Sequence, residues 1–281
     1  MKRVVFLKYD DGTILSDQQY NDAEERLGAP LWRLHRADLH DVLLAKAREL
    51  GVEITMGAKV KSFDWQAPSA SLEGGEAVRA DVILAADGQL PVACASRDAR
   101  KIGGTTLQWK LSIQNANSSF CVRERPKGLR RFSTSRPKRV ACGEVGEGCH
   151  VLLYPIRQGE YLNVVATQPA NHTKGPKYVV STDPKKFLDR YKNWDSTLVG
   201  VLERLPKDNL LEWKLCDLEP METWLFPGRK IALLGDASHA MLPSAAQGAS
   251  MGIEDCSAIA ELLARAEHRD QIPQVLKAFR T

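Results

Sequence analysis

The segment that most constrains the fold runs from Lys230 to Cys256, with the sequence KIALLGDASHAMLPSAAQGASMGIEDC. It opens with Ile231–Leu234, a short apolar run that is typical of a strand buried on both faces. Asp236 follows this run, then a loop containing Pro243, then a helix predicted over residues 248–264. Ligands of open α/β sheets bind at the carboxyl ends of the strands, so we expect Asp236 to lie beside a ligand.

The residue types around this strand end suit a ligand that carries both hydroxyl groups and negative charge. The carboxylate of Asp236 can accept hydrogen bonds from hydroxyl groups such as those of a ribose or a ribityl chain. The helix that follows begins at Gln247, Gly248 and Ala249. Its free backbone N–H groups carry roughly half a positive charge and can stabilise an anion.

A second run of the same kind lies earlier in the chain. Residues 81–86 read DVILAA, which predicts another strand buried on both faces of a parallel sheet. This strand ends at Asp87 and Gly88. The two predicted strands therefore each end in an acidic residue next to a glycine.

An amphipathic helix is predicted before the second run, because apolar residues recur there with a period of 3.6. These residues are Leu39, Val42, Leu43, Ala47 and Leu50. Asp38 is expected to be the N-cap, and Gly51 stands where a left-handed glycine ends a helix. Alternating residues over 52–56 predict a half-buried strand, and Gly74-Gly75 predicts a hairpin.

The middle of the chain has fewer regular patterns. Two strand-like runs, residues 151–153 and 161–165, are joined through Tyr154-Pro155 and Gly159. A helical region is predicted from Pro184 to Leu205, where Pro206 would stop it.

Taken together, the residues of the segment 230–256 resemble the second flavin-binding fingerprint of the FAD-dependent aromatic monooxygenases, the p-hydroxybenzoate hydroxylase and salicylate hydroxylase class. The matching residues are Gly235, Asp236, Ala237, His239, Pro243, Gln247, Gly248, Gly252 and Asp255. Leu242-Pro243 followed by residues 246–249 is most similar to the salicylate hydroxylase-like branch. The resemblance implies that Asp236 binds the ribityl chain, whereas Pro243, Gln247, Gly248 and Ala249 lie against the isoalloxazine. It also implies a structural role for His239.

Two further segments agree with this resemblance. The segment 81–88 is similar to the other internal fingerprint of the family, which implies that Asp87 and Gly88 lie beside the cofactor. Trp32–Leu39, WRLHRADL, resembles the segment whose arginine contacts FAD, which implies that role for Arg36. A cation at a helix start opposes the helix dipole unless an anion is close, and a pyrophosphate would supply one.

The resemblance implies an α/β fold with two parts. A partial, Rossmann-like, three-layer FAD-binding domain is expected over residues 30–90 and 225–281. An antiparallel or mixed β-sheet domain on the substrate side is expected over 1–29 and 91–224. The implied activity is that of an FAD-dependent, NAD(P)H-using monooxygenase, which hydroxylates an aromatic or related small molecule through a flavin C4a-hydroperoxide. No catalytic residue is assigned.

The chain also departs from the family pattern. The family begins with a βαβ unit that carries a GxGxxG motif for the ADP pyrophosphate, and this sequence contains no GxGxxG. The Ser and Arg that follow Asp-Gly in the family are displaced here, and residues 89–142 have no recognisable counterpart. A second hypothesis is therefore a truncated, catalytically inactive homologue, or a partner-binding fragment, that does not hold FAD.

Charge is unevenly distributed along the chain. The net charge is +4, but residues 89–139 hold 12 basic and 2 acidic side chains, which leaves a net −6 on the remainder. A nucleic-acid site on this basic segment is a third, weaker hypothesis, because Phe132 is the one aromatic residue between positions 123 and 139. The expected partner is instead a small aromatic-type molecule.

Other classes of protein are excluded on elementary grounds. The six cysteines contain no CxxC pair, so neither a zinc module nor a disulfide scaffold is expected, and Cys142, Cys149 and His150 lack a fourth metal ligand. No apolar run reaches the ~18 residues of a membrane span, and the apolar stretch near the N-terminus is too short for a signal peptide. We therefore expect a cytoplasmic protein without a metal site, and the sequence leaves its oligomeric state open.

Overall fold

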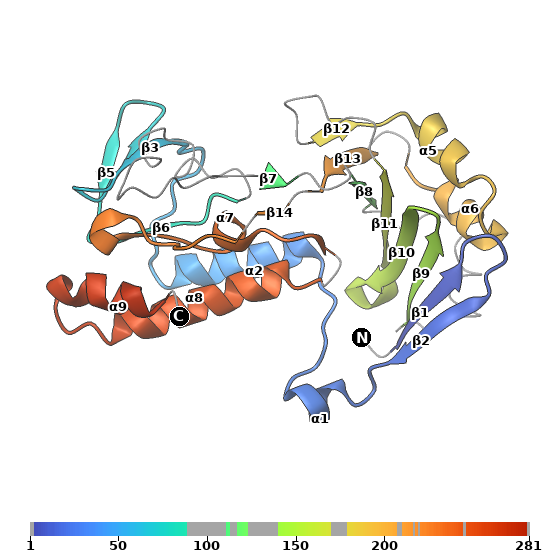
Figure 1. Cartoon of the computed structure of the whole chain (residues 1–281), viewed down its shortest axis with the longest axis horizontal. Helices are drawn as coiled ribbons and strands as arrows, with labels where there is room; N and C mark the ends of the chain where they lie inside the picture. Colours follow the sequence, from blue (N-terminus) through green and yellow to red (C-terminus); the bar gives the residue numbers. More distant parts are fainter. Residues whose placement is uncertain are drawn as a thin grey trace. The chain divides into compact units, whose positions relative to one another are not determined.

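The computed structural model of the chain describes residues 3–88, 111–112, 117–122, 140–169, 179–206, 210–215, 217–218, 220–243 and 246–279. The chain folds into two units, each with its own core. Unit 1 comprises residues 1–53 and 115–214, and unit 2 comprises residues 54–114 and 215–281. Figure 1 labels most of the helices and strands of both units.

Unit 1 is built on an eight-stranded mixed sheet with the order β12-β13-β8-β11-β10-β9-β1-β2. Its strands are β1 (Arg3–Lys8), β2 (Ile14–Gln19), β8 (Asn117–Val122), β9 (Val140–Gly146), β10 (Cys149–Ile156), β11 (Tyr161–Pro169), β12 (Val179–Ser181) and β13 (Leu211–Lys214). β1 and β9 pair in parallel and the other neighbours are antiparallel. The predicted strand pair over 151–165 is confirmed as β10 and β11, which η2 (Arg157–Gly159) connects.

Two helices follow β12 in the sequence, α5 (Pro184–Tyr191) and α6 (Ser196–Leu202). Each begins with an aspartate whose carboxylate accepts a backbone N–H: Asp183 from Lys185 at 2.9 Å and Asp195 from Thr197 at 3.0 Å. The helical region predicted from Pro184 to Leu205 is thus present as two helices, because Asp195 caps the second one.

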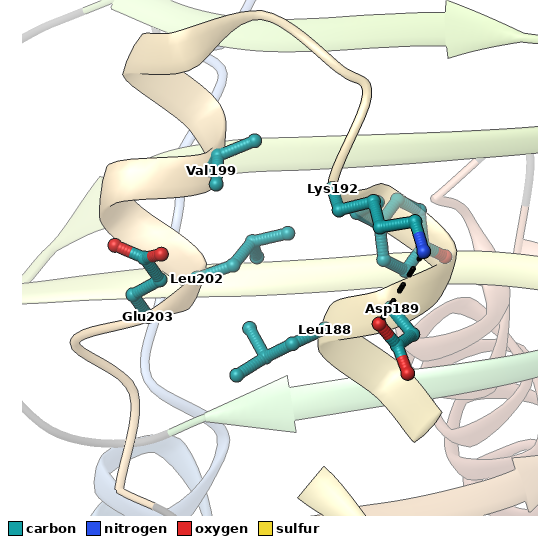
Figure 2. Close-up of a pocket in the computed structure, with 7 residues that line it drawn as sticks. Leu188, Asp189, Lys192, Val199, Leu202 and Glu203 are labelled. Atoms are coloured by element: carbon teal, nitrogen blue, oxygen red, sulfur yellow. Dashed lines mark ion pairs between the residues drawn. The ribbon is translucent and has the colours of Figure 1, made fainter. Parts of the chain in front are cut away.

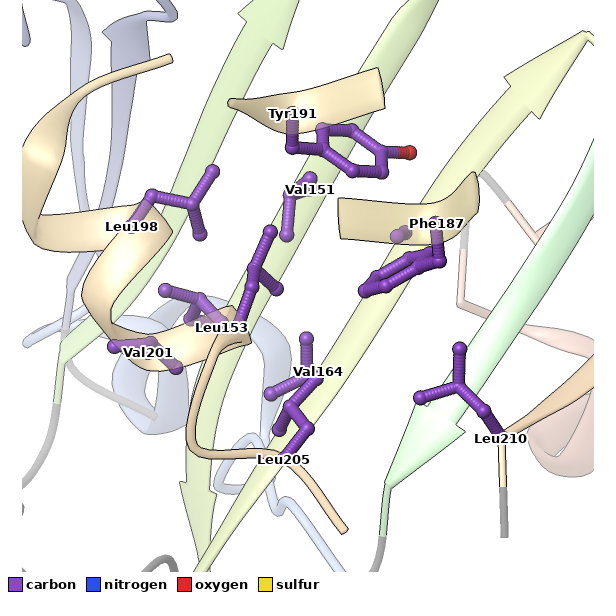
Figure 3. Packing of buried hydrophobic residues seen from close by; sticks show 11 residues of the cluster. Val151, Leu153, Val164, Phe187, Tyr191, Leu198, Val201, Leu205 and Leu210 are labelled. Atoms are coloured by element: carbon purple, nitrogen blue, oxygen red, sulfur yellow. The ribbon is translucent and has the colours of Figure 1, made fainter. Parts of the chain in front are cut away.

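The core of unit 1 lies between these helices and one face of the sheet. The sheet contributes alternate residues of β10 and β11, and the helices contribute their apolar faces (Figure 3). The buried members are Val151, Leu153, Val164, Ala166, Phe187, Tyr191, Leu198, Val201, Leu202, Leu205 and Leu210. Because strand residues alternate between faces, Tyr154, Tyr161 and Asn163 belong to the opposite side, called here the second face of the sheet.

The predicted amphipathic helix is present as α2 (Arg36–Glu49), and Gly51 has the expected left-handed conformation with φ +78°. The helix begins three residues earlier than predicted, with His35 as N-cap, so the prediction that Asp38 caps it is wrong. Asp38 instead accepts two hydrogen bonds from Arg157, one of them from Nε to Oδ2 at 2.6 Å. This ion pair fixes the first turn of α2 to the connection between β10 and β11.

The apolar stripe of α2 is not covered as its pattern predicts. None of the residues of α2 is buried. The side chain of Val42 is 66% exposed, and that of Leu50, which follows the last residue of the helix, is 69% exposed. The strand predicted over 52–56 is absent, because these residues form turns and irregular backbone without a partner strand. The helix therefore owes its position to polar and aromatic contacts near its first turn, whereas its apolar side contributes little burial.

Unit 2 has three layers around a parallel pair of strands, β6 (Ile83–Ala85) and β15 (Ile231–Leu233). One layer is the antiparallel sheet of β3 (Val60–Asp64), β4 (Ser69–Leu72) and β5 (Ala77–Arg79). The other layer contains α8 (Gly248–Ala264) and α9 (Ile272–Ala278). The remaining elements are α7 (Asp236–His239), β7 (Leu111–Ser112), β14 (Asp217–Leu218), η3 (Pro227–Arg229) and η5 (Arg269–Gln271), and unit 1 also contains α1 (Ala23–Leu27).

Apolar residues on both sides of the parallel pair hold these layers together. On one side, the parallel strands contribute Ile231, Leu233 and Ala85 to a cluster. This cluster also contains Phe63 of β3 and Trp65, which follows that strand. On the other side, a cluster joins β15 to the helices through Leu234, Ile259, Ile272, Leu276 and Phe279. The prediction of two parallel strands is confirmed, although Leu84 is too exposed for a strand that is buried on both faces. The predicted hairpin is also confirmed, and Gly75 in its turn has a φ of +87°.

The two units divide the chain differently from the domains expected from the sequence. Residues 30–53, expected with the FAD-binding domain, belong to the unit that holds the large sheet. The basic segment 89–139 lies almost entirely outside the described residues. Of the helices that the structure describes, none has the length and apolar character needed to cross a bilayer.

A truncation in the unit 1 core should be costly. Leu198 is fully buried between α6 and the sheet, so Leu198→Ala should lower the free energy of unfolding by about 2–5 kcal/mol. The matched control is Ile14→Ala on β2, where the side chain is exposed and the change should stay within about 0.5 kcal/mol. Urea unfolding measures the change in the free energy of unfolding in both variants, and hydrogen exchange of the β10 and β11 amides reports on unit 1 in particular. An equal loss of stability in the two variants would contradict this assignment of the core.

Candidate functional site

The predicted site residues of unit 2 gather at one edge of the parallel strand pair. Because β6 and β15 run in the same direction, with Leu233 opposite Ala85, their carboxyl ends lie at the same edge. The Leu234 N–H donates to the Ala85 carbonyl at 3.0 Å, which extends the pairing to the last residue before the turn. Asp87 and Asp236 follow the two strands and are thereby brought to this shared edge.

The turn after β15 can be made only by a glycine. Gly235 has φ +57° and ψ −137°, a region in which a Cβ atom is strained. Gly252, in the second turn of α8, lies directly against it: a Cβ added to either glycine would stand 3.8 Å from the Cα of the other. Helix α8 consequently approaches the strand end with little more than backbone between them.

Asp255 fixes this approach. Its Oδ2 accepts a hydrogen bond from the Gly235 N–H at 2.8 Å and one from His239 Nε2 at 2.6 Å. The His239 ring also packs 5.4 Å from that of Trp224, measured between centroids. A single carboxylate oxygen on α8 therefore binds both ends of the turn that contains Asp236, and His239 has a positioning contact in keeping with the structural role expected of it.

Asp236 is held beside the start of α8 without a hydrogen-bond partner for its carboxylate among the described residues. A Cβ on Gly248, the first residue of α8, would stand 3.8 Å from Asp236 Oδ1. The exposed carboxylate of Asp236 therefore lies beside the N-terminus of α8. An acceptor fixed in this position is free to bind hydroxyl groups of a ligand.

The other predicted residues of this segment surround the same helix start. Gln247 is the N-cap of α8 but makes no side-chain capping bond, and Ala249 and Gln247 are exposed. Pro243 is exposed in the loop before the helix, and Ala246 has a φ of +53°. Gly88 also has a positive φ, +82°, at the end of β6. The loop and the helix start thus present backbone and short side chains at their surface.

Arg36 belongs to unit 1, so it is placed here only within that unit. It is the first residue of α2 and is exposed, and no ion pair or hydrogen bond of its guanidinium occurs among the described residues. Its neighbour in the first turn, Asp38, is already engaged by Arg157 and by His35, whose Nδ1 lies 3.1 Å from Asp38 Oδ1. Among the residues that the structure describes, the cation of Arg36 therefore has no anion as a partner.

A pocket between α5 and α6 lacks the features of a ligand site. It has a volume of about 110 Å³ and is lined by Leu188, Asp189, Tyr191, Lys192, Val199, Leu202 and Glu203 (Figure 2). Ligand pockets are usually larger, ~300–1,000 Å³. Its charged rim is internally paired, with Lys192 Nζ 3.6 Å from Asp189 Oδ1. None of the predicted site residues lines it, and we assign it no function.

With this geometry established, comparison with known proteins decides the family. A family model described as an FAD binding domain matches residues 19–280. The chain belongs to this FAD-binding family. The match extends over nearly the whole chain and includes both fingerprints, so the resemblance and the cofactor predicted from the sequence, FAD, are confirmed at the level of the family.

Curated relatives carry names of the same kind. FAD-dependent monooxygenase atnJ of Arthrinium sp is 32% identical over 289 residues, covering 99% of this chain and 64% of the relative. The 3-hydroxybenzoate 6-hydroxylase 1 of Aquipseudomonas alcaligenes is 29% identical over 262 residues, covering 91% of this chain and 61% of the relative. The chain thus spans a little under two thirds of the length of these relatives.

Solved structures share the fold. A structure of CtdE in complex with FAD and a substrate has a TM-score of 0.80 at 19% identity, covering 99% of this chain and 67% of that one. A salicylate hydroxylase substrate complex has a TM-score of 0.75 at 23% identity, with coverage of 99% and 67%. These likenesses confirm the predicted α/β fold class with its mixed and antiparallel sheets.

The residue that sequence reasoning missed is Asp255 as the anchor of the site. The sequence pattern includes Asp255 in the fingerprint but indicates no role for it. A signal was present, because Gly248, Gly252 and Asp255 are spaced i, i+4 and i+7 and so share one helix face. Two small residues and an acid on one face indicate a close backbone approach followed by a polar contact.

The two glycines at this approach should respond oppositely to alanine. Gly235→Ala forces a Cβ into a strained backbone region and should destabilise unit 2 by about 1–3 kcal/mol. Gly252→Ala meets only an ordinary contact within a helix, so it should be neutral or stabilising by up to about 1 kcal/mol. Urea unfolding of the two variants measures the difference, and an equal loss in both would contradict the backbone argument.

Removing the anchor should loosen the whole turn. Asp255→Ala leaves the Gly235 N–H and His239 without their shared acceptor, which should cost about 1–3 kcal/mol of stability. Hydrogen exchange at Gly235–His239 should accelerate in this variant. The neighbouring exposed Glu254→Ala on the same helix is the control and should leave exchange there unchanged; acceleration in both variants would argue against a specific anchor.

Proposed function

We propose that this chain acts as an FAD-dependent, NAD(P)H-using monooxygenase that hydroxylates an aromatic or related small molecule. The observation that carries the proposal is the position of the Asp236 carboxylate, which has no hydrogen-bond partner among the described residues and lies beside the N-terminus of α8 at the carboxyl edge of the parallel strands. Family membership and the names of the relatives support the same activity.

The residues of this edge fit the ribityl and isoalloxazine half of FAD. Asp236 would accept hydrogen bonds from ribityl hydroxyl groups, since its oxygens have no other partner among the described residues. Pro243, Gln247, Gly248 and Ala249 would lie along the ring system, where exposed backbone and short side chains leave space. Asp87 and Gly88, at the same strand edge, would lie beside the cofactor. Arg36 would bind a phosphate oxygen.

The protein's own contribution to the chemistry is orientation and charge. When bound and reduced by NAD(P)H, FAD supplies the activation of oxygen that transfers one oxygen atom to the substrate. The N–H groups at the start of α8 would stabilise negative charge on the ring system near them. Asp255, acting through Gly235 and His239, keeps the turn and the helix start in fixed relation, so these groups need little reorganisation.

The proposed substrate is a planar aromatic compound. Among the similar proteins, one is named a 3-hydroxybenzoate hydroxylase, one is a salicylate hydroxylase, and one solved structure contains uric acid. The second face of the large sheet carries Tyr154 and Tyr161, and aromatic side chains of this kind can pack against a ring. A cytoplasmic location remains a prediction from the sequence.

FAD titration tests the proposal directly. The purified chain should bind FAD with absorption bands near about 370 and 450 nm, characteristic of oxidised flavin. Asp236→Ala should weaken binding at least tenfold, which corresponds to about 1.4 kcal/mol. Glu261→Ala removes the same charge from an exposed position of α8 and should bind FAD like the unmodified chain.

Each failure has a distinct meaning. A chain that binds no FAD would overturn the proposed activity and favour the alternative of a homologue that does not hold the cofactor. A chain that binds FAD equally well with and without Asp236 would overturn the role of that carboxylate only. Substrate-dependent consumption of NAD(P)H, measured at about 340 nm in the presence of FAD, completes the test.

A further inference from the structure

The connection between β10 and β11 holds Arg157 in a backbone conformation that is uncommon for residues other than glycine. Arg157 and Gln158 have φ values of +45° and +56°, and Gly159 completes the turn with a φ of +92°. Left-handed backbone is costly for a residue that carries a Cβ atom, and it persists only where surrounding contacts compensate for the cost. Two such residues in succession indicate that this turn is held by contacts of its side chains.

The contacts of Arg157 converge on the first turn of α2. Its guanidinium donates two hydrogen bonds to the Asp38 carboxylate, one of them from Nε to Oδ2 at 2.6 Å. The same guanidinium lies over the Tyr161 ring, 5.0 Å from the ring centroid. His35, the N-cap of α2, also stacks on Tyr161, with 6.3 Å between the ring centroids. Arg157 is therefore held by a carboxylate and by an aromatic ring at the start of the helix.

The position of Asp38 gives this ion pair an electrostatic consequence. Asp38 is the third residue of α2, so its carboxylate lies where the helix N-terminus and Arg36 would otherwise attract an anion. The hydrogen bonds from Arg157 hold the pKa of the Asp38 carboxyl well below its usual range and raise the pKa of the guanidinium. Both groups are therefore charged at neutral pH, and the charge of Asp38 is balanced by that of Arg157. The charge of Arg36 is then left for a ligand.

We propose that Arg157 is a positioning residue for the cofactor: it neutralises Asp38 and thereby keeps the start of α2 open to a phosphate group that Arg36 binds. A free carboxylate in the first turn would repel the phosphate and attract the Arg36 guanidinium toward itself. Arg157 need not touch the phosphate, because it acts through the charge of Asp38. This inference rests on the proposed function, in which Arg36 binds a phosphate oxygen of FAD.

FAD and riboflavin are suitable ligands for the test, because riboflavin has the same ring system and ribityl chain but no phosphate group. Arg157→Met removes the positive charge and keeps a long side chain. It should lower the affinity for FAD by about fivefold or more and that for riboflavin by less than about twofold. Quenching of flavin fluorescence by the whole chain measures both. Arg3→Met is the matched control, since Arg3 also donates two hydrogen bonds to an aspartate, Asp17, and this variant should bind FAD normally.

Variants of Asp38 separate this charge effect from a merely structural one. Asp38→Asn should bind FAD at least as tightly as the unmodified chain, because no carboxylate is left to repel the phosphate. The double variant Arg157→Met/Asp38→Asn should recover most of the affinity that Arg157→Met loses. If the ion pair serves only to tie α2 to the sheet, either single variant weakens FAD binding and the double variant recovers nothing. That result overturns the inference, as does an equal loss of FAD and riboflavin affinity in Arg157→Met.

The inference stays testable if Arg157→Met does not fold. Asp38→Asn then decides the matter alone: an unchanged or higher affinity for FAD supports the inference, and a loss of about fivefold or more overturns it. Loss of stability in this variant is measured separately by urea unfolding.

Inorganic pyrophosphate separates the outcome from that of the proposed function. Titrated into the same variants and followed by NMR at the amides of residues 36–38, it should give the same order of affinities as FAD. This order in a chain that binds no FAD supports the role of Arg157 and overturns the monooxygenase proposal. FAD binding that is insensitive to Arg157→Met overturns the role of Arg157 alone. Binding of neither FAD nor pyrophosphate overturns both.

Discussion

One carboxylate oxygen holds the candidate site together. Asp255 Oδ2 accepts from the backbone of Gly235 and from His239, and so joins helix α8 to the turn after β15. Gly235 also lies directly against Gly252, and its own backbone conformation, with φ +57°, requires a glycine. The position of Asp236 beside the first residue of α8 follows from these two contacts. A site built on such a backbone approach tolerates variation at its rim much better than at its anchor.

The fold was predictable where local pattern and tertiary environment agree. The strands at 83–85 and 231–233 and the helix from Gly248 to Ala264 were predicted from their apolar runs, and the strand at 231–233 is buried as its pattern requires. Predictions failed where a polar side chain is bonded to a residue that lies far away in the sequence. Asp38 has the sequence position of a helix cap, yet it pairs with Arg157, which is 119 residues away. Residues 52–56 alternate like a strand but have no neighbouring strand to pair with.

The site was predictable to the level of its motif but not of its contacts. Asp87 and Asp236 were expected at strand ends, and the parallel pairing places both at one edge. The anchoring role of Asp255 and the surroundings of the Arg33 guanidinium depend on atoms from separate segments, and a sequence pattern does not give those distances. Arg33 illustrates the difference: in the sequence it is one of several basic residues, and only the structure shows that its side chain is half-buried near Tyr154, with the Nη1 atom enclosed.

The exposed stripe of α2 has a consequence for local stability. Among the described residues, the contacts that tie this helix to the sheet come from His35 and Asp38, at its first turn. Farther along, Val42 and Leu50 add almost no burial, so the last turns depend on helix propensity and on local pairs such as Lys46 with Glu49. The helix is therefore anchored at one end and frays from the other, and amide protection should decline steadily from Arg36 toward Glu49.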